Sequence, residues 1–314
     1  MLTCKKIPFE EKDYWKELFV DSETASFFQS WDWLNLWLKH FGGDAEVIGV
    51  WEGSSLIGIG PFLKKEEDIS LIGIDPVLGE ERVSDFGDII AKKGREREVW
   101  KIVVGYIKDN GWKLNLDFIR SNSPSYNILI ELGGQSEEVD VSPFISLPVS
   151  WDEYLGMLDR HDRHELRRKL RKLDNEAEFI NPYKISDKDI VEFLRLMSLS
   201  NEQKRDFLSE KMKDFFSDIF SIFGGNKSAG LYFLKIKNIN VSGILAFYFR
   251  DEILLYNSGF DPEYAKKSVG MVLKSHLIKQ SIEEGKKKFD FLRGNERYKY
   301  DFGGRENKLY KIIL

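Results

Sequence analysis

The sequence of 314 residues predicts an α+β (mixed α/β) fold with two tandem domains, each built on a mixed, mostly antiparallel sheet flanked by helices. Three observations predict this class of fold. The chain is longer than a typical single domain, hydrophobic residues make up 42% of it, and one order of structural elements occurs twice. We place the two domains at 1–149 and 150–314.

The repeated order contains a three-strand meander. Residues 45–74 hold three apolar runs separated by Glu-Gly-Ser-Ser and Lys-Lys-Glu-Glu-Asp, and residues 229–260 hold three runs separated by Lys-Asn and Arg-Asp-Glu. Short apolar runs between such polar turns are typical of β-strands. Asp-Pro follows each meander, at Asp75-Pro76 and at Asp261-Pro262.

A helix and a short strand complete each repeat. Both helices end in a glycine, which is a typical helix stop, and we expect them at 95–111 and 269–285. The strands that follow are expected at 113–119 and 287–292. Helical, aromatic-rich sequence also precedes each meander, at 26–43 and 189–225. Because the residues themselves barely match between the halves, the repeat is one of architecture.

Composition and charge exclude several classes of protein. The formal charge of −5 argues against a general nucleic-acid coat. The single cysteine, Cys4, excludes an internal disulfide, and the four histidines show no metal-ligand spacing, so no metal is expected. We find no apolar run suited to a signal peptide or a membrane span. These features predict a cytoplasmic protein.

The sharpest chemical feature is AKKSVGMVL, at 265–273. A helix that begins with a glycine can point its backbone N–H groups at an anion, and the helix dipole favours negative charge there. Lys266 and Lys267 would add positive charge. The alternative is structural: Ser268 caps the helix, and Gly270 allows close packing against the sheet.

An arginine-rich helix is expected at 160–172. It belongs to the segment 150–179, which Ser150 opens as the expected helix N-cap, with Glu153 completing a capping box. Its arginines follow helical spacing and share one face; they are Arg160, Arg163, Arg167 and Arg171. Such a face could hold an anionic acceptor, with Arg163 and Arg167 as the central contacts. A solvated helix whose aliphatic stems lie on the sheet explains the pattern equally well.

The remaining candidates are weaker. Trp31, Trp33 and Trp37 have helical spacing and are expected in the core. The first half has no lysine pair and glycine together before its helix, so we expect it to shape the acceptor side, with Asp85 as a polar contact. Tyr256 lies at the centre of a predicted strand and either lines an acyl pocket or belongs to the core.

The chain resembles the GNAT acyltransferase superfamily, and most of all its cellulose-biosynthesis branch (CelD/BcsL-type, also called BioF2-like). The resemblance in the second half rests on RHELRRKLRKL at 163–173, LLYNSGFDPEYAKKSVGMVL at 254–273 and FDFLRGNERYKYDFG at 289–303. In the first half it rests on SWDWLNLW at 30–37, GIGPF at 58–62 and SDF at 84–86. The tandem arrangement also resembles Fem-type aminoacyltransferases, which use aminoacyl-tRNA.

The resemblance implies an acyl-CoA site at the start of the second-half helix. GNAT loops commonly read Gln/Arg-x-x-Gly-x-Gly/Ala and hold the pyrophosphate of the donor. The equivalent segment in this chain is KSVGMV, at 267–272. Lys267 is a conservative replacement of Gln/Arg, and Val272 is bulkier than the usual Gly/Ala. The residues implied in donor binding are Lys266, Lys267, Ser268, Val269, Gly270, Met271 and Val272.

The resemblance also implies a general acid. Tyr298 follows the last strand, where a GNAT tyrosine often protonates the departing thiolate, although its ring could instead pack on the sheet edge. Lys299 could bind donor phosphate, polarise a carbonyl or pair with Asp301. Glu296 is a possible general base, as is Asp261, and both are also ordinary surface carboxylates.

These observations together predict a metal-independent acyltransferase. It would move an acyl group from acetyl-CoA or another acyl-CoA to an amine or hydroxyl of a small acceptor, such as an amino sugar or a sugar nucleotide. Two alternatives stay open. One is a Fem-like aminoacyltransferase, with tRNA as the only expected nucleic-acid partner, and the other is a catalytically silent tandem GNAT protein that binds a ligand.

Overall fold

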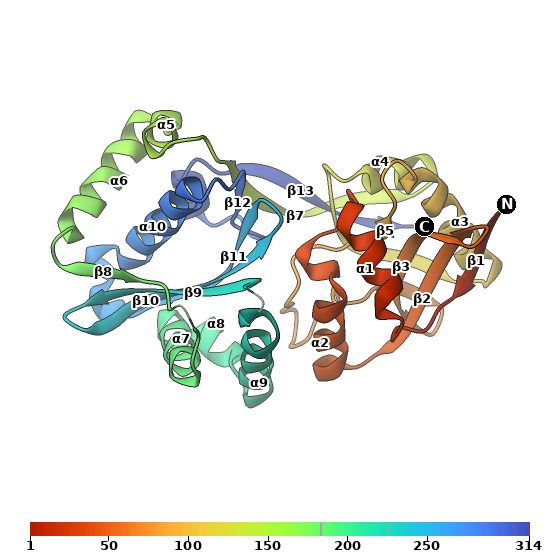
Figure 1. Ribbon diagram of the computed structural model, residues 1–314, viewed down its shortest axis with the longest axis horizontal. Helices are drawn as coiled ribbons and strands as arrows, with labels where there is room; N and C mark the ends of the chain where they lie inside the picture. The colour runs from red at the N-terminus through yellow and green to blue at the C-terminus, as the bar shows by residue number, and fades with distance from the viewer. Residues whose placement is uncertain (183, 226) are drawn as a thin grey trace. The chain divides into compact units, whose positions relative to one another are not determined.

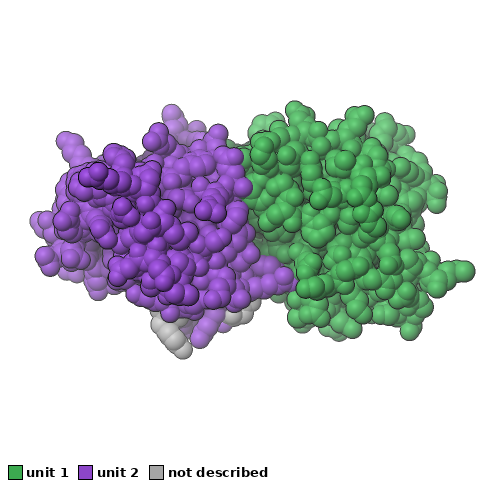
Figure 2. Space-filling view, turned by 90° about the horizontal axis from the view of Figure 1, so that it is seen from above, with its two compact units in different colours: residues 1–141, 307–314 green, residues 142–306 purple. Residues whose placement is uncertain are grey.

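The computed structural model describes residues 1–182, 184–225 and 227–314, and the chain forms two compact units (Figures 1 and 2). Unit 1 contains Met1–Val141 and Asn307–Leu314, and unit 2 contains Ser142–Glu306. The sequence prediction divides the chain at 149/150 and leaves the C-terminus in the second domain. The difference arises because β13 (Arg305–Ile313) pairs antiparallel with β6 (Lys113–Arg120). Local sequence patterns do not reveal such long-range pairing.

The sheet of unit 1 is mixed. Its strands lie in the order β1-β2-β3-β4-β6-β13, and β5 pairs with β3. The pair β4–β6 is parallel and the other pairs are antiparallel. The strands not yet given are β1 (Leu2–Lys6), β2 (Asp44–Glu52), β3 (Ser55–Lys65), β4 (Asp68–Leu71) and β5 (Ile90–Ala91).

The aromatic residues of unit 1 form much of its core, as expected. Trp33 and Trp37 are buried, and the Trp33 indole donates to Ser84 Oγ at 2.8 Å. Trp31 is half-buried. A methyl group at Gly58 would lie 2.4 Å from Val99, so glycine lets α3 approach β3 closely. The helices are α1 (Lys12–Asp21), η1 (Phe27–Gln29), α2 (Trp31–Phe41), α3 (Glu96–Asp109) and α4 (Pro124–Glu131).

The sheet of unit 2 has the order β7-β12-β11-β10-β9-β8. Only the last part of β7 belongs to this unit, and only the pair β11–β12 is parallel among the pairs that join these strands in the described residues. Lys237 and Asn238 have φ of 50° and 66°, which suits the tight turn between β9 and β10. The strands are β7 (Gln135–Ser146), β8 (Ala177–Ile180), β9 (Ala229–Ile236), β10 (Ile239–Phe249), β11 (Glu252–Phe260) and β12 (Lys288–Asp290).

Helices cover both faces of this sheet (Figure 1). One face carries α5 (Trp151–Met157), α6 (Arg160–Leu173) and α10 (Val269–Glu283), whose apolar residues share one core with the strands. Ser150 caps α5 as predicted, because its Oγ accepts from the N–H of Glu153. The other face carries α7 (Asp187–Ser200), α8 (Glu202–Phe207), α9 (Glu210–Ile219) and the π-helical turn η2 (Phe220–Gly224).

The predicted repeat is confirmed. The meanders are β2–β4 and β9–β11, the helices that follow are α3 and α10, and the next strands are β6 and β12. The mixed α+β fold is therefore established in both halves. No described helix is long and apolar enough to cross a membrane.

Candidate functional site

Strands β11 and β12 part in the middle of unit 2. They are paired over three positions only, and the last pair is Leu254 with Asp290. Beyond this pair, the residues that follow β12 no longer pair with β11. The N–H of Phe291 bonds to Pro143 O of β7, and the N–H of Leu292 bonds to Asp290 Oδ1. Strand β11 continues for six more residues, 255–260, which we call the open segment of β11. Two parallel strands that separate in this way leave main-chain groups available to a ligand.

A bulge lies in the open segment. Leu255 pairs with Ala246 and Asn257 pairs with Leu245, so Tyr256 between them is the extra residue. The Tyr256 ring lies 4.7 Å from the ring of Phe247 and 6.3 Å from that of Phe216. It is half-buried. Its contacts therefore include core packing, and its partial exposure leaves the acyl-pocket role as a prediction.

The start of α10 presents unused backbone donors. A short 3₁₀ helix, η3 (Pro262–Lys267), leads into Ser268, which has a left-handed backbone with φ of 56°. Ser268 O accepts from the N–H groups of Met271 and Val272, both at 3.0 Å. Among the described residues, the N–H groups of Val269 and Gly270 have no acceptor, and the Ser268 side chain makes no capping hydrogen bond. A helix start of this kind favours an anion.

The glycine at this helix start is not required for packing. A methyl group at Gly270 would touch only Lys274 Nζ and Phe260 Cδ1, both at 3.8 Å, which is ordinary contact. Glycine within a helix costs about 1 kcal/mol relative to alanine. Ser268 is the N-cap residue of α10, as the structural alternative expects, but it caps through its carbonyl and not through its side chain, and the packing at Gly270 has room for a methyl group. The side chains of Val269 and Val272 are buried in the core, so these two residues offer a ligand only their backbone.

The lysines that precede α10 are held by α6 and the residues after it. Lys267 forms an ion pair with Glu176, and this contact lowers the pKa of the Glu176 carboxyl. Lys172 donates to the carbonyl of Lys266 at 2.9 Å, while the Lys266 side chain is exposed. The turn before α10 is thus fixed, and Lys266 is the lysine whose charge faces solvent.

The predicted acid and its neighbours lie on α11 (Arg297–Asp301) and the loop before it. The Tyr298 ring meets Phe291 edge-on at 6.1 Å, and burial raises the pKa of its hydroxyl. The phenol is therefore protonated at neutral pH, as a general acid must be. The Tyr298 ring also packs against the core of unit 2, as the structural interpretation expected. Its role as a general acid stays a prediction.

Lys299 is a buried anchor of the same loop. Its side chain is 1% exposed, and its Nζ donates to the carbonyls of Leu292, Arg293 and Gly294 at 2.7–3.0 Å. Its carboxylate partner is Glu296, at 2.9 Å. The expected alternative pairing with Asp301 is not found, because Asp301 pairs with Arg297. Lys299 therefore holds the loop that carries Tyr298.

Two further lysines, which the sequence analysis missed, approach the open segment of β11. Lys274 on α10 is buried and donates to Ser258 Oγ at 3.2 Å, and burial lowers its pKa to about 7. Lys204 on α8 donates to Asn257 Oδ1 at 2.9 Å and to Ser258 O, and burial lowers its pKa to about 8. For Lys274 the sequence did hold a signal: it is a lysine within the apolar run of α10, and it lies four residues after Gly270, so the two residues share one face of the helix.

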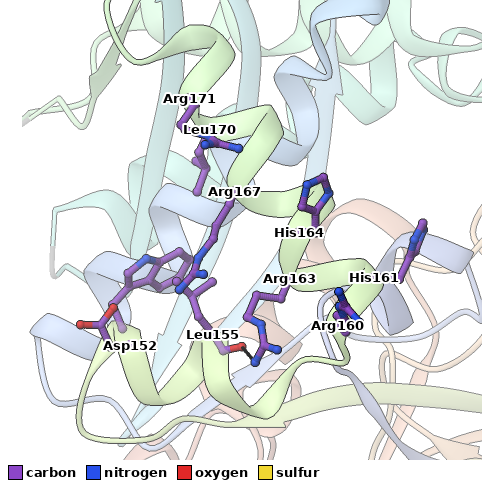
Figure 3. A pocket seen from close by; sticks show the side chains of 10 residues that line it. Asp152, Leu155, Arg160, His161, Arg163, His164, Arg167, Leu170 and Arg171 are labelled. Carbon is purple, nitrogen blue, oxygen red and sulfur yellow. Dashed lines mark hydrogen bonds between the residues drawn. The ribbon is translucent and has the colours of Figure 1, made fainter.

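The arginine face of α6 borders an open groove of about 1100 Å³ (Figure 3). Arg163 donates to Leu155 O at 3.4 Å, and within the described ranges none of the four arginines forms an ion pair. The groove is lined by Trp151, Asp152, Leu155, Arg160, His161, Arg163, His164, Arg167, Leu170 and Arg171. A smaller hollow of about 370 Å³ includes Met271, so it reaches the start of α10.

The other predicted contact, Asp85, belongs to unit 1. It lies between β4 and β5 and is half-buried. The donor-site and acid candidates, Tyr256 and both arginines all belong to unit 2.

Residues 160–300 match the family model described as "Acetyltransf_6: Acetyltransferase (GNAT) domain". Similar solved structures include FemX, with 13% identity over 99% of this chain and 97% of that chain and a TM-score of 0.69. L-PGS from Bacillus licheniformis has 13% identity over 98% and 93%, with a TM-score of 0.62. A tandem GNAT protein from the clavulanic acid biosynthesis pathway has 9% identity over 99% and 98%, with a TM-score of 0.53. No curated protein matches the sequence.

These findings define the class of the protein. Residues 160–300 match a GNAT-type domain of the acetyltransferase family that is also called CelD or BioF2-like. The chain as a whole has the tandem GNAT fold, with one GNAT-like half in each part of the sequence.

Proposed function

We propose that unit 2 transfers an acyl group from a CoA thioester, acetyl-CoA or a longer one, to an amine or hydroxyl of a small acceptor. One observation carries this proposal. The strands β11 and β12 part beside the start of α10, where the N–H groups of Val269 and Gly270 have no acceptor in the part of the chain that the structure describes. The diphosphate of CoA would accept from these N–H groups, and the helix dipole would favour its charge. The thioester would then extend along the open segment of β11.

The residues on α11 and its loop suit the chemistry of this transfer. The acceptor nitrogen or oxygen forms a bond to the acyl carbon, and the bond from that carbon to sulfur breaks. The nucleophile gives up a proton, for which Glu296 is our candidate acceptor, since its carboxylate is largely exposed beside Lys299. Tyr298 gives its proton to the departing thiolate, and its hydroxyl is protonated at neutral pH, as this step requires.

Calorimetry with CoA and acetyl-CoA, followed by detection of released thiol, tests this function. We expect a bound thioester and a weaker complex in Gly270→Leu, because a bulky side chain would stand where the diphosphate accepts. Lys279→Met, on the exposed C-terminal part of α10, is the matched control and should bind normally. Folded protein that binds no CoA thioester at millimolar concentration would remove the CoA assignment.

The arginine face of α6 favours a second candidate, an aminoacyl-tRNA donor of the Fem type. Four arginines without ion pairs in the described structure line an open groove, and such rows bind phosphate backbones. Filter binding with charged tRNA at several salt concentrations distinguishes the two donors. Tight, salt-sensitive tRNA binding without CoA binding supports the tRNA donor. Arg163→Ala should then lower the slope of log affinity against log salt by about one unit.

A further inference from the structure

Two lysines from opposite faces of the unit 2 sheet meet at one residue of β11. Lys204 comes from α8 on one face, and Lys274 comes from α10 on the other (Figure 1). Lys204 Nζ donates to Ser258 O, and Lys274 Nζ donates to Ser258 Oγ at 3.2 Å. Ser258 lies in the open segment, four residues beyond the last pair with β12. Both ammonium groups therefore lie where the two strands have parted.

The described residues give the two ammonium groups no carboxylate partner of their own. Neither lysine forms an ion pair with a described residue. Glu296 is the acidic group that acts on both, and its carboxylate is already paired with Lys299 at 2.9 Å. The Tyr298 ring, 4.8 Å from Lys274 Nζ, is neutral.

Uncompensated buried charge is costly, so a site of this kind either loses protons or receives an anion. Both lysines bond to Ser258, one to its carbonyl and the other to its hydroxyl, and the side chains of Asn257, Ser258 and Tyr298 are partly exposed. An amide, a hydroxyl and two amines make a donor-rich surface. Carboxylate and phosphate groups are the biological partners that such a surface recognises.

We propose that Lys204 and Lys274 bind a compact oxyanion, a carboxylate or a phosphate group, carried by the acyl acceptor close to its nucleophile. This inference rests on the proposed transferase function, and it names the acceptor class: an anionic amine or alcohol. The lysines take up a proton as the anion arrives, because the anion stabilises their charged form. They thus select acceptors by charge in the place where acceptor and acyl group meet.

Matched acceptor pairs test the selection. Glycine against glycinamide differs only by the carboxylate, and phosphoethanolamine against ethanolamine differs only by the phosphate. We expect the wild-type protein to favour the charged member of at least one pair by tenfold or more in kcat/KM for thiol release from acetyl-CoA. The pair that responds identifies the oxyanion. Lys274→Met and Lys204→Met should bring the ratio of kcat/KM for the charged acceptor to kcat/KM for the neutral acceptor close to one. Lys279→Met should leave this ratio as in the wild type.

The change in ratio between wild type and variant is the decisive quantity, because differences in amine pKa within a pair cancel. If Lys274 acted only as a general base, Lys274→Met would lower kcat/KM for both acceptors of a pair by the same factor and leave their ratio unchanged. This result would overturn the proposal. Equal use of charged and neutral members by the wild type would overturn it as well. Binding of CoA without acceptor tests the donor site separately, so its failure is distinguishable from failure of this inference.

A titration that needs no turnover gives a second test. Protein carrying ¹⁵N-labelled lysine is titrated with pH in the presence of sodium succinate, inorganic phosphate or succinamide. We expect succinate or phosphate to raise the Lys274 pKa by one unit or more, and succinamide to leave it unchanged. Circular dichroism confirms that each variant is folded. An unchanged Lys274 pKa in both anions would contradict the proposal.

Discussion

Lys274 should make unit 2 less stable at neutral pH than at high pH, and Lys274→Met should remove the share of that pH dependence that comes from Lys274. Burial lowers the pKa of this lysine from 10.5 to about 7 in the folded protein. The unfolded chain therefore binds the proton more tightly than the folded one. Stability rises as the pH increases from about 7 to about 10.5, and it is lost again as the pH falls through this window.

The size of the effect follows from the pKa shift. Each pH unit inside the window changes the free energy of unfolding by about 1.4 kcal/mol, so a shift from 10.5 to about 7 corresponds to about 5 kcal/mol at most. Methionine has a similar volume and carries no charge, but it loses the hydrogen bond to Ser258, which contributes about 1 kcal/mol. We therefore expect Lys274→Met to be more stable than wild type by about 2–4 kcal/mol at pH 7.

Urea denaturation of wild type and Lys274→Met between pH 6.5 and about 9.5 measures this difference. The advantage of the variant should shrink by about 2–3 kcal/mol from pH 7 to pH 9. Lys279→Met, which removes an exposed lysine of the same helix, should follow the wild-type curve. Parallel curves for wild type and Lys274→Met would refute the argument that this lysine is buried at a cost.

Three other substitutions test separate parts of the site. Gly270→Ala should keep or slightly increase stability, by up to about 1 kcal/mol, yet weaken CoA binding measured by calorimetry; a stability loss would show that packing does need glycine there. Tyr298→Phe should lower kcat of thiol release with little change in KM, and an unchanged rate would end its role as general acid. Lys299→Met should destabilise the protein by about 3 kcal/mol in urea, because three carbonyls and Glu296 lose their donor; a neutral effect would contradict the anchoring role.

Much of the fold could be predicted from local pattern. Alternating apolar runs and polar turns located both meanders, and terminal glycines located the ends of α3 and α10. The place of the C-terminal strand could not be predicted, because its pairing with β6 joins segments far apart in the sequence. The boundary between the compact units lies at 141/142 and not at 149/150, because residues 144–146 at the end of β7 pair with β12 of unit 2.

The candidate site was partly visible in the sequence. The helix start at Val269 and the arginine face of α6 follow from local spacing, and both exist in the structure. The burial of Lys274 depends on three elements that enclose one side chain, which no local pattern encodes. Lys299 shows the same limit, since its three carbonyl partners depend on a loop in which Leu292 and Gly294 have positive φ.

The most direct test of the central claim is the response of two amide groups to a CoA thioester. In ¹⁵N-labelled protein, the amide signals of Val269 and Gly270 should shift strongly on addition of acetyl-CoA, with saturation at micromolar to low millimolar concentration. Signals of exposed α10 residues such as Lys279 should stay in place. Saturable binding that leaves both amides unmoved, or no binding at all, would contradict the assignment of this helix start as the donor site.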